Sequence, residues 1–250
     1  MFPNSKTHSI QPASAYDTQK ASAATADKAV GPVRNRRVAK RTLTSENILR
    51  TVANCAISFP LIVRSIFRPK TSKALRERVM LGVTAINDCR FCAWGHSHWA
   101  FSQGVSLEEV NQILGNQDGA LKANDPAEAA AILFGQHYAE QLGKIDPDSI
   151  LNLRNHFSAA QVREILAYVY FITFTNLSGN TVDAVLERIR GEGRPLTVVE
   201  GTAGVALAPL LLVLVALIKM GKIIGMDKRR AKRNRPAVAV QRDGGSKRTT

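Results

Sequence analysis

The sequence predicts an all-α protein, and three observations support this fold class. From about residue 45 to residue 190, apolar residues recur every three or four positions, as in helices that bury one face. Residues that commonly cap helices, such as Ser, Asp and Asn, precede several of these runs. The chain contains neither a series of alternating, strand-like segments nor an internal repeat. We therefore expect a helical body without a β-sheet.

The charge of the chain lies mainly at its two ends. The 250 residues carry a formal net charge of +14. Residues 1–42 contain 8 basic and 2 acidic residues, and residues 227–250 contain 9 basic and 2 acidic residues, so the middle is nearly neutral. We expect both ends to be disordered basic tails. Such tails favour solvent or anionic lipid, and no specific nucleic-acid partner is expected.

The first half of the body, which we place at residues 43–200, reads as four helices. A helix that starts near Ser45 has one packing face, formed by Ile48, Leu49, Val52 and Ala53. Pro60 is expected to end this helix and restart the chain as a second one. Helices at 71–86 and 89–103 follow, separated only by Asn87 and Asp88.

The second half of the body begins with a capping box at Ser106–Glu109, which opens a short helix that ends at Gly115. Asp125 and Pro126 open another helix, which reaches Gly143. A second capping box at Ser158–Gln161 starts a strongly apolar helix with a central or interfacial position. We expect a break at 176–180 and then a last amphipathic helix.

An apolar helix is expected at 201–226. Gly201–Ile218 contains 18 uncharged residues and is followed by a basic cluster, which is close to the lower limit of roughly 17–25 residues for crossing a bilayer. We expect a membrane anchor that is re-entrant or lies in the interface; the alternative is a helix buried in an oligomer contact. No signal-peptide pattern occurs in residues 1–20, so the protein is expected in the cytoplasm, attached to the inner face of the membrane.

The chemistry is expected within residues 77–96. Cys89, Cys92 and His96 are spaced by three and four residues, so in a helix their side chains share one face. With Asn87 and Asp88 as the cap, Cys89 falls in the first turn, where backbone N–H groups and the helix dipole favour a thiolate. Glu77 lies on the preceding helix among apolar neighbours, where a partly buried carboxylate can move protons.

The Cys-x-x-Cys pair is common to redox dithiols and zinc sites. A closed zinc site needs four ligands, and the available set is Cys89, Cys92, His96 and His98. His98 lies about 200° around the helix from His96, so both cannot face one metal, and no metal is expected. The redox interpretation remains. Cys55, in an apolar run, is expected to be a small core residue.

Glu77-x11-Cys89-x2-Cys92-x3-His96 resembles the signature of the AhpD-like alkylhydroperoxidases in the carboxymuconolactone decarboxylase superfamily. The resemblance extends more loosely from about Phe59 to Arg190. It implies a thiol peroxidase in which Cys92 attacks and Cys89 resolves. His96 and Glu77 are expected to form a proton relay through water, in which Glu77 orients the imidazole or accepts its proton. Trimers or larger assemblies and an external reductant of the lipoyl or thioredoxin kind, with no bound cofactor, are also implied. Phe91 stands where well-known members have a histidine between the cysteines.

Two hypotheses from different classes follow. The first is a membrane-associated thiol peroxidase or disulfide oxidoreductase that reduces hydroperoxides. The second is a non-catalytic helical protein at the membrane whose Cys-x-x-Cys pair senses redox state. The order of the two thiols is also open, because the position of Cys89 nearest the helix N-terminus favours Cys89 as the nucleophile.

Overall fold

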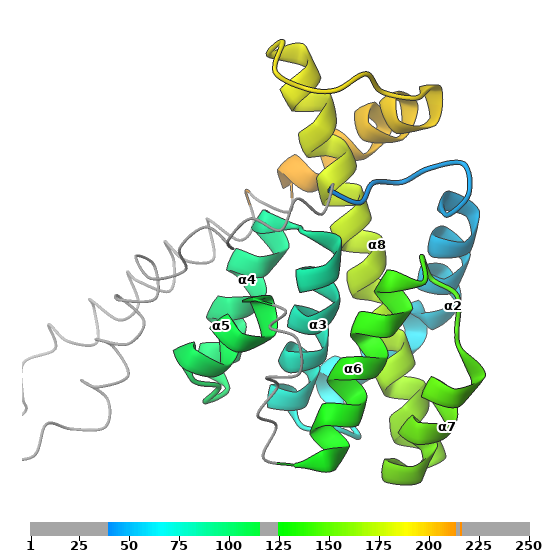
Figure 1. Ribbon diagram of the computed structural model, residues 1–250, viewed down its shortest axis with the longest axis vertical. Coiled ribbons are helices and arrows are strands. Elements are labelled where there is room, and N and C mark those ends of the chain that lie inside the picture. The colour runs from blue at the N-terminus through cyan, green and yellow to red at the C-terminus, as the bar shows by residue number, and fades with distance from the viewer. Residues whose placement is uncertain (1–39, 116–124, 214–215, 217–250) are drawn as a thin grey trace, which may run out of the picture. The chain divides into compact units, whose positions relative to one another are not determined.

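A computed structural model of the chain describes residues 40–115, 125–213 and 216. The expectations for the tails at 1–39 and 227–250, and for the apolar segment beyond Val213 other than Ala216, lie outside the described residues. In the described part every regular element is a helix, so the predicted all-α class is confirmed (Figure 1).

Two helices hold the others together. The elements are α2 (Ile48–Phe67), α3 (Lys73–Asn87), α4 (Arg90–Ser102), α5 (Leu107–Gly115), α6 (Pro126–Glu140), α7 (Pro147–His156) and α8 (Ala159–Ile189). The 31-residue α8 contacts α2, α3, α4, α6 and α7, and α3 contacts α4, α5, α6 and α8. The cysteine and histidine positions on α4 are therefore set by α3 and α8.

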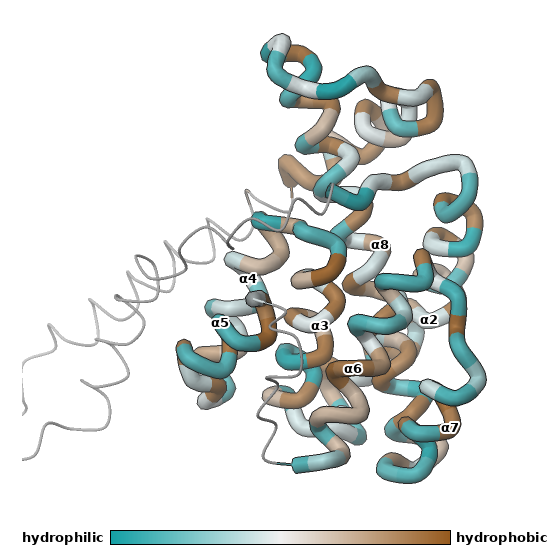
Figure 2. Tube along the Cα trace, viewed as in Figure 1, coloured by the Kyte–Doolittle hydropathy of each residue, from teal (hydrophilic) through white to brown (hydrophobic). Residues whose placement is uncertain are grey.

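The core between α3, α6 and α8 is closely packed. Val79, Val83, Ile165, Val169 and Ile172 are completely buried there. Two glycines allow α3 and α6 to approach: a Cβ at Gly82 would lie 3.0 Å from Ile132, and one at Gly135 would lie 3.0 Å from Val83. In Figure 2, hydrophobic stretches of the trace occur along both helices. This contact fixes the helix that carries Glu77.

Local capping determines several helix starts; the caps at Asp125 and Ser158 were predicted from the sequence, and that at Ser72 was not. The Ser72 and Asp125 side chains accept hydrogen bonds at the starts of α3 and α6, and Ser158 with Gln161 forms a complete capping box at α8. The helix α7 was not foreseen. Its start has a local signal, however, because Asp146 caps it and Pro147 occupies its first turn.

The predicted break at 176–180 is wrong, because α8 runs through it without interruption. Asn and Gly weaken an isolated helix, but the side chains of Asn176 and Asn180 are buried against the rest of the protein. Asn176 is fully buried with its amide against Thr84, and the Asn180 amide donates to the carbonyl oxygens of Arg41 and Asn87. Tertiary hydrogen bonds therefore outweigh local propensity.

The restart predicted at Pro60 is also wrong, because α2 is a single helix of 20 residues that contains Pro60. The predicted packing face is wrong in part: Leu49 and Val52 are exposed, and Ile48 and Ala53 are only partly buried. The buried residues of α2 are Thr51, Ser58, Ile62 and Ser65. Small side chains on that face let α2 lie close along α8. Pro60 itself is exposed.

The connection between α2 and α3 is held by a buried carboxylate. Glu164 on α8 accepts hydrogen bonds from the backbone N–H groups of Lys70 and Thr71 and from the hydroxyls of Thr71 and Tyr168. Burial raises the pKa of Glu164, but the bonds from Tyr168, Lys70 and Thr71 outweigh it and hold the pKa below its ordinary value. The start of α3 is thereby fixed to α8.

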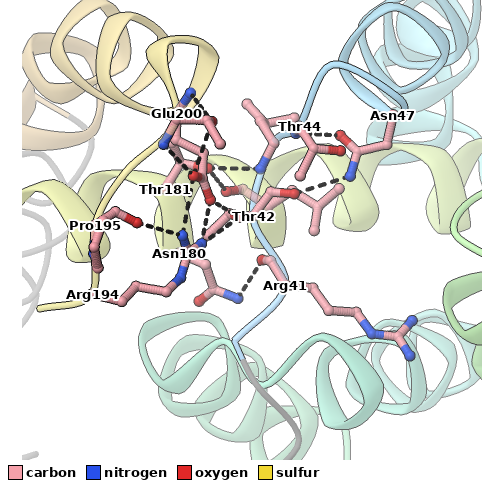
Figure 3. Close-up of polar contacts among 12 residues, drawn as sticks. Arg41, Thr42, Thr44, Asn47, Asn180, Thr181, Arg194, Pro195 and Glu200 are labelled. Carbon is pink, nitrogen blue, oxygen red and sulfur yellow. Dashed lines mark hydrogen bonds and ion pairs between the residues drawn. The ribbon is translucent and has the colours of Figure 1, made fainter.

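The first described segment, which begins at Lys40, is fastened by Glu200. The Thr42 hydroxyl donates to Glu200 at 2.6 Å, and the Leu43 N–H donates to the Thr181 hydroxyl at 2.9 Å (Figure 3). Arg194 forms an ion pair with Glu200. The side-chain bond from Arg194 is the main reason that the pKa of Glu200 falls to about 2.

The apolar helix begins at Val198, earlier than predicted, and is described as far as Val213. A Cβ at Gly204 would lie 2.5 Å from Val185, so its first part packs directly against α8. The first compact unit of the chain ends at Leu207, and the second comprises residues 208–250. Among the described helices, α2 is long and apolar enough to cross a membrane by length and composition.

Candidate functional site

Glu77 and His96 are in direct contact beneath the surface. The Nδ1 atom of His96 lies 2.8 Å from Oε2 of Glu77, and both side chains are buried. When Glu77 is ionised, its carboxylate accepts a hydrogen bond from the Nδ1–H group of His96. In the neutral imidazole, Nε2 is then the nitrogen that can accept a proton. The carboxylate thus contacts the imidazole directly, in a position to orient it, which is one of the two roles expected for Glu77 from the sequence.

The second oxygen of Glu77 is bound by the preceding residue. Both Nε and Nη2 of Arg76 lie 2.9 Å from Oε1. A buried carboxylate is costly unless it is paired and hydrogen bonded. Arg76 and His96 together satisfy both oxygens of Glu77, so the charge is held in one orientation. Arg76 was not singled out from the sequence, since an arginine beside an acid gives no signal of its own.

Cys89 and Cys92 form a disulfide at the start of α4, with Cα atoms 5.3 Å apart. Cys89 does not lie in the first turn as predicted. It is itself the N-cap residue, with extended backbone, and its sulfur accepts the N–H of Cys92. Cys92 occupies the first turn, four residues before His96 on the same face of α4. Cys89 is 2% exposed and Cys92 is 8% exposed.

The tight turn before Cys89 explains why Cys89 caps α4 in place of the predicted Asn87 and Asp88. Asp88 ends α3 with φ of 53°, in the left-handed region, so the chain turns at Asp88 and α4 can start only after Cys89. The carbonyl oxygen of Asn87 accepts a hydrogen bond of 2.7 Å from the Asn180 side chain. The turn that presents the cysteines is therefore anchored to α8.

Gly179 on α8 is a further residue of the site. A Cβ at this position would lie 3.4 Å from the sulfur of Cys89 and 3.9 Å from that of Cys92. The backbone of α8 thus forms a wall beside the disulfide. The sequence offered one hint, a glycine inside a helical pattern, which was interpreted as part of a break.

Aromatic side chains surround the motif. The ring of Trp99 meets that of His96 edge to face, with centroids 5.0 Å apart, and Trp99 is half exposed. Trp94 contacts the rings of Phe91 and His98. Trp99 therefore packs against the imidazole of His96 and is itself partly exposed to solvent.

The remaining candidates lie apart from this site. Cys55 on α2 is a free, half-buried thiol, and burial raises its pKa. Nδ1 of His98 lies 2.8 Å from the carbonyl oxygen of Trp94. Among the described residues, no three His, Cys, Asp or Glu side chains are grouped as metal ligands would be.

The site therefore combines a disulfide at the N-terminus of α4 with a chain of contacts from Arg76 through the buried Glu77 to the buried His96 on α3 and α4. Such an arrangement can hold a thiolate, take up its proton and form an internal disulfide. Comparison of the chain with known protein families, with curated proteins and with solved structures gave no match.

Proposed function

We propose that the protein is a thiol peroxidase that reduces hydroperoxides with Cys89 and Cys92. The observation that carries the proposal is the pairing of these cysteines on the helix whose His96 is bound by buried Glu77. A structural disulfide has no need of a buried, oriented acid–base pair beside it. That pair supports a reaction in which a thiol must lose its proton.

Cys92 is the proposed attacking thiol. His96 Nε2 takes the proton of Cys92, and the thiolate attacks the distal oxygen of ROOH, so that the O–O bond breaks. The alkoxide leaves and takes a proton from His96 as ROH, and Cys92 becomes a sulfenic acid. The greater exposure of Cys92 and its position one turn before His96 support this assignment.

Cys89 then resolves the intermediate. Its thiol attacks the sulfenic sulfur of Cys92, water leaves, and the disulfide forms. An external dithiol of the lipoyl or thioredoxin kind donates two electrons and two protons to restore both thiols. The net reaction converts ROOH and a dithiol into ROH, water and a disulfide, and needs no bound cofactor.

Turnover with each cysteine removed tests the proposal. The measurement is alcohol formed from cumene hydroperoxide with dihydrolipoamide as reductant. Cys92→Ser should abolish turnover, and Cys55→Ser, the matched control, should retain it. Cys89→Ser should accumulate a sulfenic acid on Cys92, detected as a dimedone adduct. An adduct on Cys89 in Cys92→Ser would reverse the roles, and no turnover with any dithiol would favour the redox-sensing alternative.

The cytoplasmic, membrane-attached location and the homo-oligomer, as a trimer or larger, are also proposals. The apolar and exposed character of Val205, Leu210 and Leu212 supports a covered apolar helix. If that helix anchors the chain, the full-length protein should sediment with membranes and resist extraction by salt. A chain that ends at Leu207, where the first unit ends, should bind membranes less tightly than the full-length protein.

A further inference from the structure

The helix α2 turns its apolar residues outward. Seven large hydrophobic residues on it are exposed by 40–79%: Leu49, Val52, Ile57, Phe59, Val63, Ile66 and Phe67. The residues buried against the body are mostly small and polar. A helix on the surface of a soluble domain normally places its apolar stripe inward. We call these seven residues the outer α2 face.

The outer α2 face is long and continuous. The 20 residues of α2 extend for about 30 Å, and the apolar residues follow it from its first turn to its last. Soluble monomers rarely expose apolar patches of more than a few hundred Å², and larger ones mark interaction sites. The inner side of α2 lies along α8, so the helix presents this face without leaving the body.

The charged residues of α2 and of the turn that follows it are all basic. Residues 47–76 contain no acidic residue, whereas Arg50, Arg64, Arg68, Lys70 and Lys73 lie on or just after α2 and are exposed. Within the described residues, the side chains of Arg64, Arg68, Lys70 and Lys73 take part in no ion pair. Four of these cations gather at the C-terminal end of the helix and in the turn that follows.

We propose that the outer α2 face binds an anionic lipid surface, with α2 lying in the plane of the membrane. The hydrophobic side chains enter the boundary between headgroups and acyl chains, and the cations contact anionic headgroups. A second copy of the chain fits this face less well. If two α2 helices paired, the cations of both helices would lie in one interface, and neither helix carries an acidic residue to neutralise them. The site is independent of the thiol chemistry.

Vesicle flotation of the full-length protein tests the proposal. The vesicles are phosphatidylcholine with and without phosphatidylserine. Each cation near an anionic surface contributes about fivefold in affinity, so Arg64→Gln with Arg68→Gln should weaken binding to the anionic vesicles by roughly 20- to 30-fold. Phe59→Ser with Ile66→Ser and Phe67→Ser should reduce binding to both kinds of vesicle. All these positions are exposed, so circular dichroism should show unchanged helix content.

A matched control removes exposed hydrophobic residues elsewhere. Leu133→Ser with Leu151→Ser, on α6 and α7, should bind vesicles as the unchanged protein does. Equal binding by the α2 variants would overturn the proposal and assign membrane contact to other segments. If the Phe59, Ile66 and Phe67 variant instead dissociates an oligomer in light scattering and still binds vesicles fully, the face is a contact between copies. Peroxidase turnover should be unchanged in every variant.

Discussion

His96 and Glu77 lie nineteen residues apart in the chain and 2.8 Å apart in the fold. The contact joins α4 to α3 at the level of the cysteine pair, and Arg76 completes the chain of charges from the other side of the carboxylate. In the proposed reaction, this contact would hold in place the imidazole that takes the proton of Cys92.

The first prediction concerns this acid–base pair. In the reduced protein, Glu77→Gln and His96→Ala should each slow alkylation of Cys92 at neutral pH by roughly 10²- to 10⁴-fold, because the thiol loses its proton acceptor or the group that orients it. Rates of iodoacetamide labelling measure this. Glu109→Gln, which alters an acid paired with Arg78 on α3, is the control and should leave the rate unchanged. Normal rates in both site variants would mean that the helix dipole alone activates the thiol.

Reversible formation of the Cys89–Cys92 disulfide is the second prediction. Mild peroxide treatment of the reduced protein should remove two hydrogens from the peptide that carries both cysteines, since a resolving thiol is adjacent. Mass spectrometry before and after addition of dithiothreitol measures this change. Cys55 should remain a thiol throughout and serves as an internal reference. A stable sulfenic acid on one cysteine, with the other reduced, would contradict the resolving step.

The third prediction separates access from stability at Gly179. Gly179→Ala should raise the free energy of unfolding by about 0.5–1 kcal/mol, because alanine favours helix, and should slow labelling of the reduced cysteines by placing a methyl group against them. Gly95→Ala on α4 is the matched control, since a Cβ there meets no atom within 4 Å. Gly95→Ala should raise the free energy of unfolding by a similar amount without slowing the labelling of the reduced cysteines. Equal labelling rates in the two variants would show that α8 does not limit access.

Asn180 should be important for the position of the cysteines. Its side chain donates to the carbonyl oxygens of Arg41 and Asn87, and Asn180→Ala leaves both buried acceptors without this donor. We expect a loss of about 1–3 kcal/mol in the free energy of unfolding, together with altered thiol reactivity. Denaturant titration measures the stability. Asn155→Ala, at an exposed position on α7, should cost far less; equal losses would remove the case for a specific anchor.

The last prediction is a dependence on pH through Glu200. The pKa of Glu200 is lowered from 4.5 to about 2, so its contribution to stability is complete above about pH 4.5 and is lost as the pH falls toward 2. Glu200→Gln removes this contribution. The variant should therefore be less stable than the unchanged protein at neutral pH, and the difference should shrink in acid. Denaturant titrations at about pH 7 and about pH 3 measure it; a constant difference would contradict the assignment.

The sequence by itself determined the features that depend on neighbouring residues. Asp125 and Ser158 start helices because an N-cap acts within one turn. Cys92 and His96 share a face because four residues make about one turn of helix. The all-α class follows from the same local periodicity, repeated along the body.

Only the tertiary structure decided the features that depend on segments far apart in the chain. The outward direction of the apolar side of α2 follows from the close fit of its small residues against α8, and a helical pattern cannot show which side meets a partner. The continuity of α8 depends on Asn180, whose hydrogen bonds reach back 93 and 139 residues. The direct contact of Glu77 with His96 depends on the turn at Asp88, where a positive φ sets the angle between α3 and α4. These contacts add free energy that local propensity does not contain, which is why they could be seen only in the folded chain.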